Sequence, residues 1–311
     1  MKRLTAAVVA TVVGAAGVGT GPAGAATPST RMIAFGSAVR NPTGLASDRA
    51  GDLFATDFSP ITGSVVELRP RRSGGYGSPA VLPFGDTLAG ATAVTVDRGG
   101  DVFVANEVAN SIVELPAQRG GGYGTPAALP FAPMIDGPDG VAVDAAGDVF
   151  TANFDSDSVV ELRAAPAPGQ SPLAELPFGS VLDGPTGLAV DTAGDVFALS
   201  SGNDAVFEVR PDGKGGYGAP QPLRFGRTLR TPSAITIDRA GDLIVANTSG
   251  RSVIELPATG SGRFAAPRAL PFGASLGDPA GVAATPAGAV VAVPAAHSSG
   301  GAVELTGALN P

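Results

Sequence analysis

The densest group of oxygen-bearing side chains in the sequence lies between residues 136 and 157. Asp136 and Asp139 come just before a short apolar run, and Asn153, Asp155 and Asp157 follow the next apolar run. Carboxylate and amide oxygens are the ligands that a hard cation such as Ca²⁺ prefers. If loops bring these residues together, they predict a Ca²⁺ site; a solvated acidic loop is the alternative. No other cofactor is expected.

Other catalytic motifs are sparse. The chain has no Cys and a single His, His297, which is followed by Ser298 and Ser299. A cysteine nucleophile is therefore excluded, and nothing in the spacing specifies a Ser-His-Asp triad. Whether the protein is an enzyme stays open from the sequence, and a non-catalytic role is favoured.

The acidic residues belong to a unit of about 47 residues that recurs along the chain. Its clearest copy is GPDGVAVDAAGDVFTAN, residues 137–153, followed by SVVEL and the tag LPFG. The Asp of the turn recurs as Asp48, Asp97, Asp144, Asp191 and Asp238, with Thr285 in the sixth copy. The Glu of the third run recurs as Glu67, Glu114, Glu161, Glu208, Glu255 and Glu304. A fixed period of 40 to 50 residues with several strand signals predicts a β-propeller.

Each copy predicts a blade of four strands, labelled a to d from the channel outward. In the third copy, strand a is expected at residues 140–143, strand b at 149–152 and strand c at 159–162. A tight turn joins strands a and b, with Gly supplying a positive φ and Asp capping the backbone. The Leu-Pro-Phe tag is expected on strand d, because Pro cannot donate to a ladder and so favours an edge.

The two ends of the chain predict how the ring closes. A first tag precedes the first repeat, at residues 33–36, and few residues follow the last strand c at 302–305. Residues 31–36 are therefore expected to form strand d of the last blade, which removes both exposed edges. The predicted fold is all-β: a six-bladed propeller of four-stranded blades, closed by an N-terminal outer strand.

The N-terminus has the pattern of an export signal. Lys2 and Arg3 precede an apolar run at residues 4–18, and an A-x-A site follows at 23–25. This predicts a signal peptide at 1–25, a linker at 26–30 and the propeller at 31–311, in a secreted, monomeric protein without a membrane span. After cleavage, 18 basic residues face 28 acidic ones. Nucleic acid is therefore not an expected partner.

The pattern P-x-G-V-A-V-D-x-x-G-D-V-F-x-A-N, followed by V-V-E-L, resembles NHL-repeat propellers over residues 31–308. The LPFG tag and the 47-residue pitch are most similar to the extracellular sensor propellers of bacterial receptor Ser/Thr kinases. The Asn-Asn-Arg triplet of those sensors is absent, and neither a kinase domain nor a membrane helix accompanies the repeats. The resemblance implies a recognition scaffold for a protein, peptide or cell-envelope glycan.

In such propellers the d–a and b–c loops share one face, where ligands usually bind. The residues predicted to form this ligand-binding face are Thr43, Asp57, Phe58, Thr92, Asn106, Asp139, Asn153, Phe154, Thr186, Ser233 and Asn247. The alternative for the Asn and Asp residues is that they only cap loops. The GGYG turns with Tyr76, Tyr123 and Tyr217 are expected to cover the outer strands, with a glycan-contacting rim as the alternative.

Three functions remain open from the sequence. A binding scaffold is the leading hypothesis. The alternative is a divalent-metal-dependent hydrolase or lyase of lactonase type, centred on the third blade. A lyase of the antibiotic-cleaving type would need several His, which this chain lacks. The third hypothesis is a structural envelope protein without a specific ligand.

Overall fold

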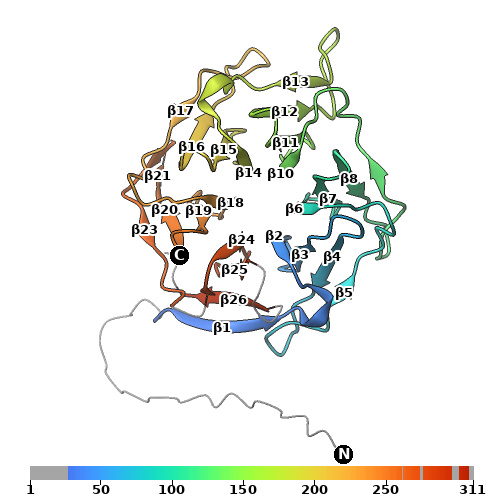
Figure 1. The fold of residues 1–311 in the computed structure, drawn as a ribbon, viewed down its shortest axis with the longest axis vertical. Coiled ribbons are helices and arrows are strands. Elements are labelled where there is room, and N and C mark those ends of the chain that lie inside the picture. The colour runs from blue at the N-terminus through green and yellow to red at the C-terminus, as the bar shows by residue number, and fades with distance from the viewer. Residues whose placement is uncertain (1–26, 261, 274–275, 296–300, 308–311) are drawn as a thin grey trace, which may run out of the picture.

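The computed structural model describes residues 27–260, 262–273, 276–295 and 301–307. These residues form six four-stranded antiparallel sheets, arranged as blades around a central channel (Figure 1). The predicted fold class is confirmed. The predicted signal peptide and His297 lie outside the described residues. No helix in the described ranges is long and apolar enough to cross a membrane.

Within blades 1 to 5 the strands follow chain order from the channel outward. Blade 1 consists of β2 (Pro42–Ser47), β3 (Leu53–Asp57), β4 (Ser64–Leu68) and β5 (Ala80–Val81). Blade 2 consists of β6 (Ala91–Val96), β7 (Val102–Asn106), β8 (Ser111–Leu115) and β9 (Ala127–Ala128). Blade 3 consists of β10 (Pro138–Val143), β11 (Val149–Asn153), β12 (Ser158–Leu162) and β13 (Leu173–Glu175).

Blade 4 consists of β14 (Pro185–Val190), β15 (Val196–Ser200), β16 (Ala205–Val209) and β17 (Gln221–Pro222). Blade 5 consists of β18 (Pro232–Ile237), β19 (Leu243–Asn247), β20 (Ser252–Leu256) and β23 (Arg268–Ala269), with a side hairpin of β21 (Ala258–Gly260) and β22 (Arg263–Phe264). Blade 6 consists of β24 (Pro279–Ala284), β25 (Val290–Pro294), β26 (Gly301–Thr306) and β1 (Ser29–Ala34). Two single-turn 3-10 helices, η1 (Gly36–Ala38) and η2 (Gly179–Val181), follow β1 and β13.

The a–b turns form as the sequence predicts. In blade 3, Asp144 Oδ1 accepts hydrogen bonds from the backbone N–H of Ala146 at 2.8 Å and of Asp148 at 2.9 Å. Gly147 has φ +91°, a conformation that favours glycine. In blade 6 the hydroxyl of Thr285 takes the place of the carboxylate and accepts from the N–H of Ala289. The hydroxyl therefore keeps one of the turn's side-chain hydrogen bonds in the most divergent repeat.

The outer strands are shorter than predicted. Strand β13 ends at Glu175, before the tag that begins at Leu176, and the prediction that the tag lies on the strand is wrong for blades 1 to 5. The N–H of Leu176 still bonds the carbonyl of Val159 at 2.8 Å, and Pro177 has no N–H to continue the ladder beyond it. The strand of blade 4 ends at the same place although Arg224 replaces the Pro, so Pro is not the reason there. The Phe of the tag packs between blades instead, and Phe178 is buried.

Strand β1 closes the ring. It pairs antiparallel with β26 along its whole length, from Ser29 opposite Thr306 to Ala34 opposite Gly301 (Figure 1). Ile33 and Phe35 are buried in the blade 6 to blade 1 core. The strand begins two residues before the predicted boundary, because Ser29 and Thr306 share a side-chain hydrogen bond of 2.8 Å.

The GGYG turns join neighbouring blades. Glu161 on β12 is buried, and its carboxylate pairs with Arg163 at 2.7 Å. Tyr217 of blade 4 donates its hydroxyl to Glu161 at 3.3 Å, as Tyr123 of blade 2 does to Glu67 of blade 1 at 3.2 Å. Burial, followed by the charge of Glu161, raises the pKa of Tyr217 well above its usual range, so it stays a donor. These tyrosines hold adjacent blades together as well as covering the outer strands.

Candidate functional site

A β-bulge near the start of strand a aims one side chain of each blade into the channel. In blade 3, Pro138 pairs with Asn153 and Gly140 with Ala152, so Asp139 is an extra residue in its strand. A bulge bends the strand and re-aims the inserted side chain. All six blades have an irregularity at this place. The resulting ring, named here the bulge ring, consists of Thr43, Thr92, Asp139, Thr186, Ser233 and Ala280.

The glycine after the bulge is required by close packing at the channel. A Cβ on Gly140 would lie 3.1 Å from the carbonyl oxygen of Thr186 and 3.2 Å from the Cβ of Ala152. Both contacts are tighter than most side chains tolerate, and one of them is backbone. The Pro-x-Gly pattern therefore follows from the approach of strand β14 to β10.

The hydroxyls of the bulge ring bridge neighbouring blades. Thr92 Oγ1 donates to the carbonyl of Pro138, and Thr186 Oγ1 to that of Pro232, each at 3.3 Å. Thr43 and Ser233 make the corresponding bonds to the blades that follow them. These four predicted ligand-binding residues are thus part of the ring's own hydrogen bonding.

Asp139 is the exception in the bulge ring. It is the one charged residue among the described residues that line the upper cavity, whose volume is about 370 Å³. The pKa of its carboxyl is raised to about 7. Burial is the largest cause; the charges of Glu107 and Asp155 also raise the pKa, and the Thr92 hydroxyl lowers it. The carboxyl reaches the channel but protein surrounds it, so its charge is poorly solvated. The carboxyl of Asp139 is therefore about half protonated at neutral pH.

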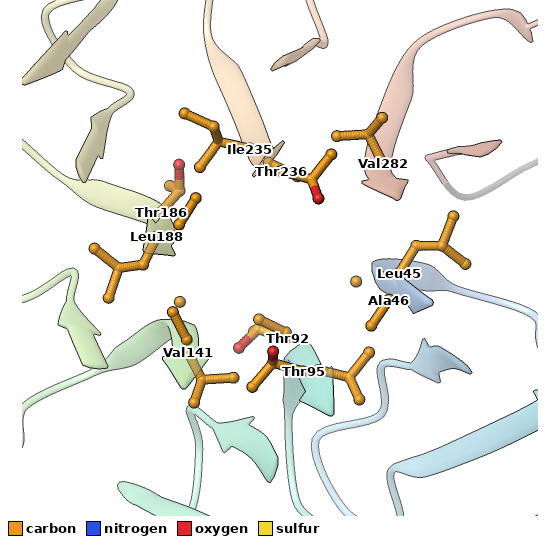
Figure 2. Close-up of a pocket in the computed structure, with 18 of the residues that line it drawn as sticks. Leu45, Ala46, Thr92, Thr95, Val141, Thr186, Leu188, Ile235, Thr236 and Val282 are labelled. Carbon is orange, nitrogen blue, oxygen red and sulfur yellow. The ribbon is translucent and has the colours of Figure 1, made fainter. Parts of the chain in front are cut away.

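The wall of the channel below the bulge ring is mixed. Leu45, Val141, Leu188 and Ile235 border it, but their side chains point away from its centre into the cores between blades (Figure 2). The half-buried side chains of Val96, Val143, Val190 and Ile237 also line the cavity. Thr95 and Thr236 add two hydroxyls to the wall. A second cavity of about 500 Å³ lies at the a–b turns, where Asp48 and its equivalents line the opening together with Arg49, Arg98 and Arg239.

The polar residues that end strand b stabilise loops. Asn106 Oδ1 accepts from the N–H of Ala89 at 2.6 Å, and its Nδ2 donates to the carbonyl of Thr87 at 3.0 Å. Asn247 repeats this arrangement in blade 5, and Asp57 accepts from two backbone N–H groups in blade 1. Asn106, Asn153 and Asn247 are fully buried. The capping alternative therefore describes these residues, and a ligand at this face does not reach the three Asn side chains.

The structure does not assemble the predicted Ca²⁺ site. Asp157 Oδ1 accepts from the N–H of Gly184 in the next blade at 2.7 Å, as Asn110 does from Gly137. Asp136 and Asp155 are exposed. Within the described ranges, no three His or acidic side chains lie close enough to share an ion. Asn153 Oδ1 is buried without a hydrogen-bond partner there, but a lone amide oxygen does not fit a metal.

Sequence reasoning missed Glu107, which lies near Asp139 across the blade 2 to blade 3 junction. Glu107 directly follows the last residue of strand b, the repeat position that Phe58 and Phe154 occupy in blades 1 and 3. Alignment of the repeats at this position could therefore have identified Glu107 from the sequence. Phe154 is 42% exposed, and its ring lies against Gly184 of blade 4. Phe58 is half-buried.

Comparison with known proteins finds relatives by structure but not by sequence. No protein-family model and no curated protein sequence matches the chain. A streptogramin B lyase is 17% identical, with a TM-score of 0.61 over 89% of this chain and 97% of the lyase. A gluconolactonase from Xanthomonas campestris is 17% identical, with a TM-score of 0.62 over 89% of both chains.

A PQQ-bound aldose sugar dehydrogenase from Streptomyces coelicolor is also similar, at 16% identity and a TM-score of 0.61 over 90% of this chain and 98% of the dehydrogenase. At these identities the likeness shows a shared propeller fold alone. The structural neighbours named here are propeller enzymes. The NHL-repeat and kinase-sensor resemblance is not shown by these comparisons.

Proposed function

We propose that the protein is a small-molecule enzyme of hydrolase or lyase type, which works by carboxyl acid–base chemistry at the upper mouth of the channel. The observation that carries this proposal is Asp139, a carboxyl with a pKa of about 7 in a ring of otherwise uncharged side chains. A general acid or base works best when its pKa lies near the operating pH. The enzyme neighbours support this reading over a pure scaffold.

Asp139 would exchange a proton with a substrate oxygen or carbon in the cavity. The Thr92 hydroxyl lies next to the carboxyl, lowers its pKa and would help to orient it. Glu107 supplies a second negative charge that keeps the pKa of Asp139 high. In the part of the chain that the structure describes, no group of side chains fits a divalent ion, and the proposed chemistry uses none.

Hydrolysis of a panel of lactones and simple esters, followed by pH-stat, tests this proposal. We expect turnover whose rate depends on a group titrating near pH 7, and a loss of at least about 100-fold in kcat in Asp139→Asn. The matched control is Asp136→Asn, an exposed carboxylate of the same blade outside the cavity. Turnover that survives in Asp139→Asn, or its absence across the panel, counts against the proposal.

A binding scaffold is the second candidate, and the exposed ring of Phe154 favours it. Exposed aromatic side chains on a rigid face commonly contact partners. In this version an NHL-like, secreted propeller captures a protein, peptide or envelope glycan. Phe154→Ala should then weaken capture of cell-envelope material at least about tenfold without changing the melting temperature. Capture that is unchanged in Phe154→Ala argues against this face as the binding surface.

A further inference from the structure

We infer that the site takes an organic cation: an aliphatic primary amine whose ammonium group binds at Asp139 and whose hydrocarbon body lies in the channel below. This inference rests on the proposed function in taking the upper cavity as the substrate site. It names the chemical class of the substrate, which the acid–base chemistry leaves open.

The charge of the cavity selects a cationic head group. Among the described residues that line the upper cavity, Asp139 is the one ionisable side chain and none is Lys, Arg or His. Glu107 and Asp155 lie close enough to act on Asp139 electrostatically, so the potential at the mouth is negative. An ammonium group offers three N–H donors, and a charge-assisted bond to a carboxylate is stronger than a neutral one. A carboxylate or phosphate head group would meet only like charge.

Asp139 is the one polar member of the bulge ring that does not donate a hydrogen bond to a backbone carbonyl, so its carboxylate can bind a ligand. Four ring hydroxyls donate to carbonyls of neighbouring blades or strands, and Ala280 has no polar group. Asp139 occupies the same position in blade 3, but an ionised carboxylate has no proton and cannot donate a hydrogen bond to a carbonyl of the next blade. Thr92 contacts it, yet the desolvation of the carboxyl remains the dominant effect. An ammonium group supplies the positive charge and the donors that this position lacks.

The wall of the channel selects an aliphatic body. The aliphatic side chains that remain accessible there are those of Val96, Val143, Val190 and Ile237, which are half-buried and line the cavity. A cavity of about 370 Å³ is within the size range of small-ligand sites. A hydrocarbon chain that contacts these side chains is removed from water.

Equilibrium binding of three probes of equal length tests this inference: n-hexylamine, n-hexanol and n-hexanoate, by calorimetry on the purified protein at pH 8. We expect hexylamine to bind at least about tenfold more tightly than hexanol, and hexanoate not to bind. From butylamine to hexylamine, each methylene should tighten binding by about fourfold, the equivalent of about 0.8 kcal/mol. Hexylamine should bind about tenfold more weakly at pH 5.5, where Asp139 is protonated.

The variants separate the carboxyl from general acidity of the surface. Asp139→Asn should abolish the preference for hexylamine over hexanol, whereas Asp136→Asn, outside the cavity, should keep it. Should Asp139→Asn fail to fold, Asp139→Thr serves in its place, because Thr occupies this position in blades 1, 2 and 4. Equal binding of hexylamine and hexanol, or an equal loss in both Asp variants, overturns the inference. As a further control, sodium chloride is added as a competitor at constant ionic strength. Hexylamine binding that sodium leaves unchanged excludes a simple screening effect, whereas complete displacement of hexylamine by sodium also overturns the inference.

The outcomes distinguish this inference from the proposed function. Amine binding that depends on Asp139, without turnover of any lactone or ester, supports the ligand class and removes the hydrolase. Turnover that depends on Asp139, with no preference for hexylamine, keeps the enzyme and overturns the ligand class.

Discussion

Replacing Asp139 by Thr should stabilise the fold while removing the function of the channel mouth. Thr43, Thr92 and Thr186 occupy the same place in blades 1, 2 and 4, so the substitution makes blade 3 resemble its neighbours. The introduced hydroxyl is placed to donate to the carbonyl of Pro185, as Thr186 does to Pro232. Residues retained for function at a cost in stability are expected at active sites.

The magnitude follows from the pKa of the carboxyl. A rise from 3.8 to about 7 corresponds to at most about 4 kcal/mol, at roughly 1.36 kcal/mol per pKa unit. Because Asp139 reaches the channel water, we discount this to roughly 1–3 kcal/mol at pH 8. The new hydrogen bond adds about 1 kcal/mol. For a domain of this size, 1 kcal/mol shifts the melting temperature by about 2–4 °C.

The pH dependence of the gain identifies its cause. With its pKa raised on folding, Asp139 contributes stability that is fully present below about pH 4 and lost as the pH rises through about 7. The increase in the free energy of unfolding on Asp139→Thr, measured by urea unfolding, should therefore be larger at pH 8 than at pH 5.5. The reciprocal control, Thr186→Asp, should lose stability mainly at pH 8. A gain that is equal at both pH values, or a loss at both, refutes the reasoning.

Three further predictions concern the ring and the cation. Ile33→Ala in the closing strand should destabilise the protein by about 2–5 kcal/mol in urea unfolding, whereas exposed Met32→Ala in the same strand should change it by less than about 0.5 kcal/mol; equal effects would contradict closure by β1. Tyr123→Phe should cost about 1 kcal/mol through its lost bond to Glu67, so an unchanged unfolding curve would rule out that contact. Excess Ca²⁺ should leave the melting temperature unchanged; a rise of several degrees that Asp139→Ala abolishes would show that the carboxylates do converge.

The fold was predictable because the same strand and turn pattern recurs six times in the sequence. The period of the turn Asp and the strand c Glu indicates the number of blades, and the unmatched tag before the first repeat indicates ring closure. The Pro in four of the six tags was enough to identify the outer strand, although not the residue at which it ends. The predicted strand extended into Leu176 and Pro177, whereas β13 ends at Glu175 and the last backbone bond to strand c comes from Leu176, because Pro177 has no N–H.

The site was only partly predictable, because loops and bulges decide which oxygens converge. The sequence placed Asp139 and Asn153 at one sheet edge, and register pairs Asn153 with Pro138, next to Asp139. The bulge then turns Asp139 toward the channel, whereas Asn153 lies buried under its loop. Asp157 was predicted as a metal ligand, but it binds the backbone of the next blade. No periodicity in the sequence distinguishes a carboxylate that faces a channel from one that holds a loop.

The titration of the Asp139 carboxyl is the most direct test of the central claim that this residue is the functional group of the channel. Carbon-detected NMR of the side-chain carboxyl groups, with Asp139→Asn used to assign the resonance, gives its pKa in the folded protein. The structure predicts a pKa of about 7, which falls when hexylamine is added. A pKa near 4 that hexylamine leaves unchanged would contradict both the buried carboxyl and the chemistry assigned to it.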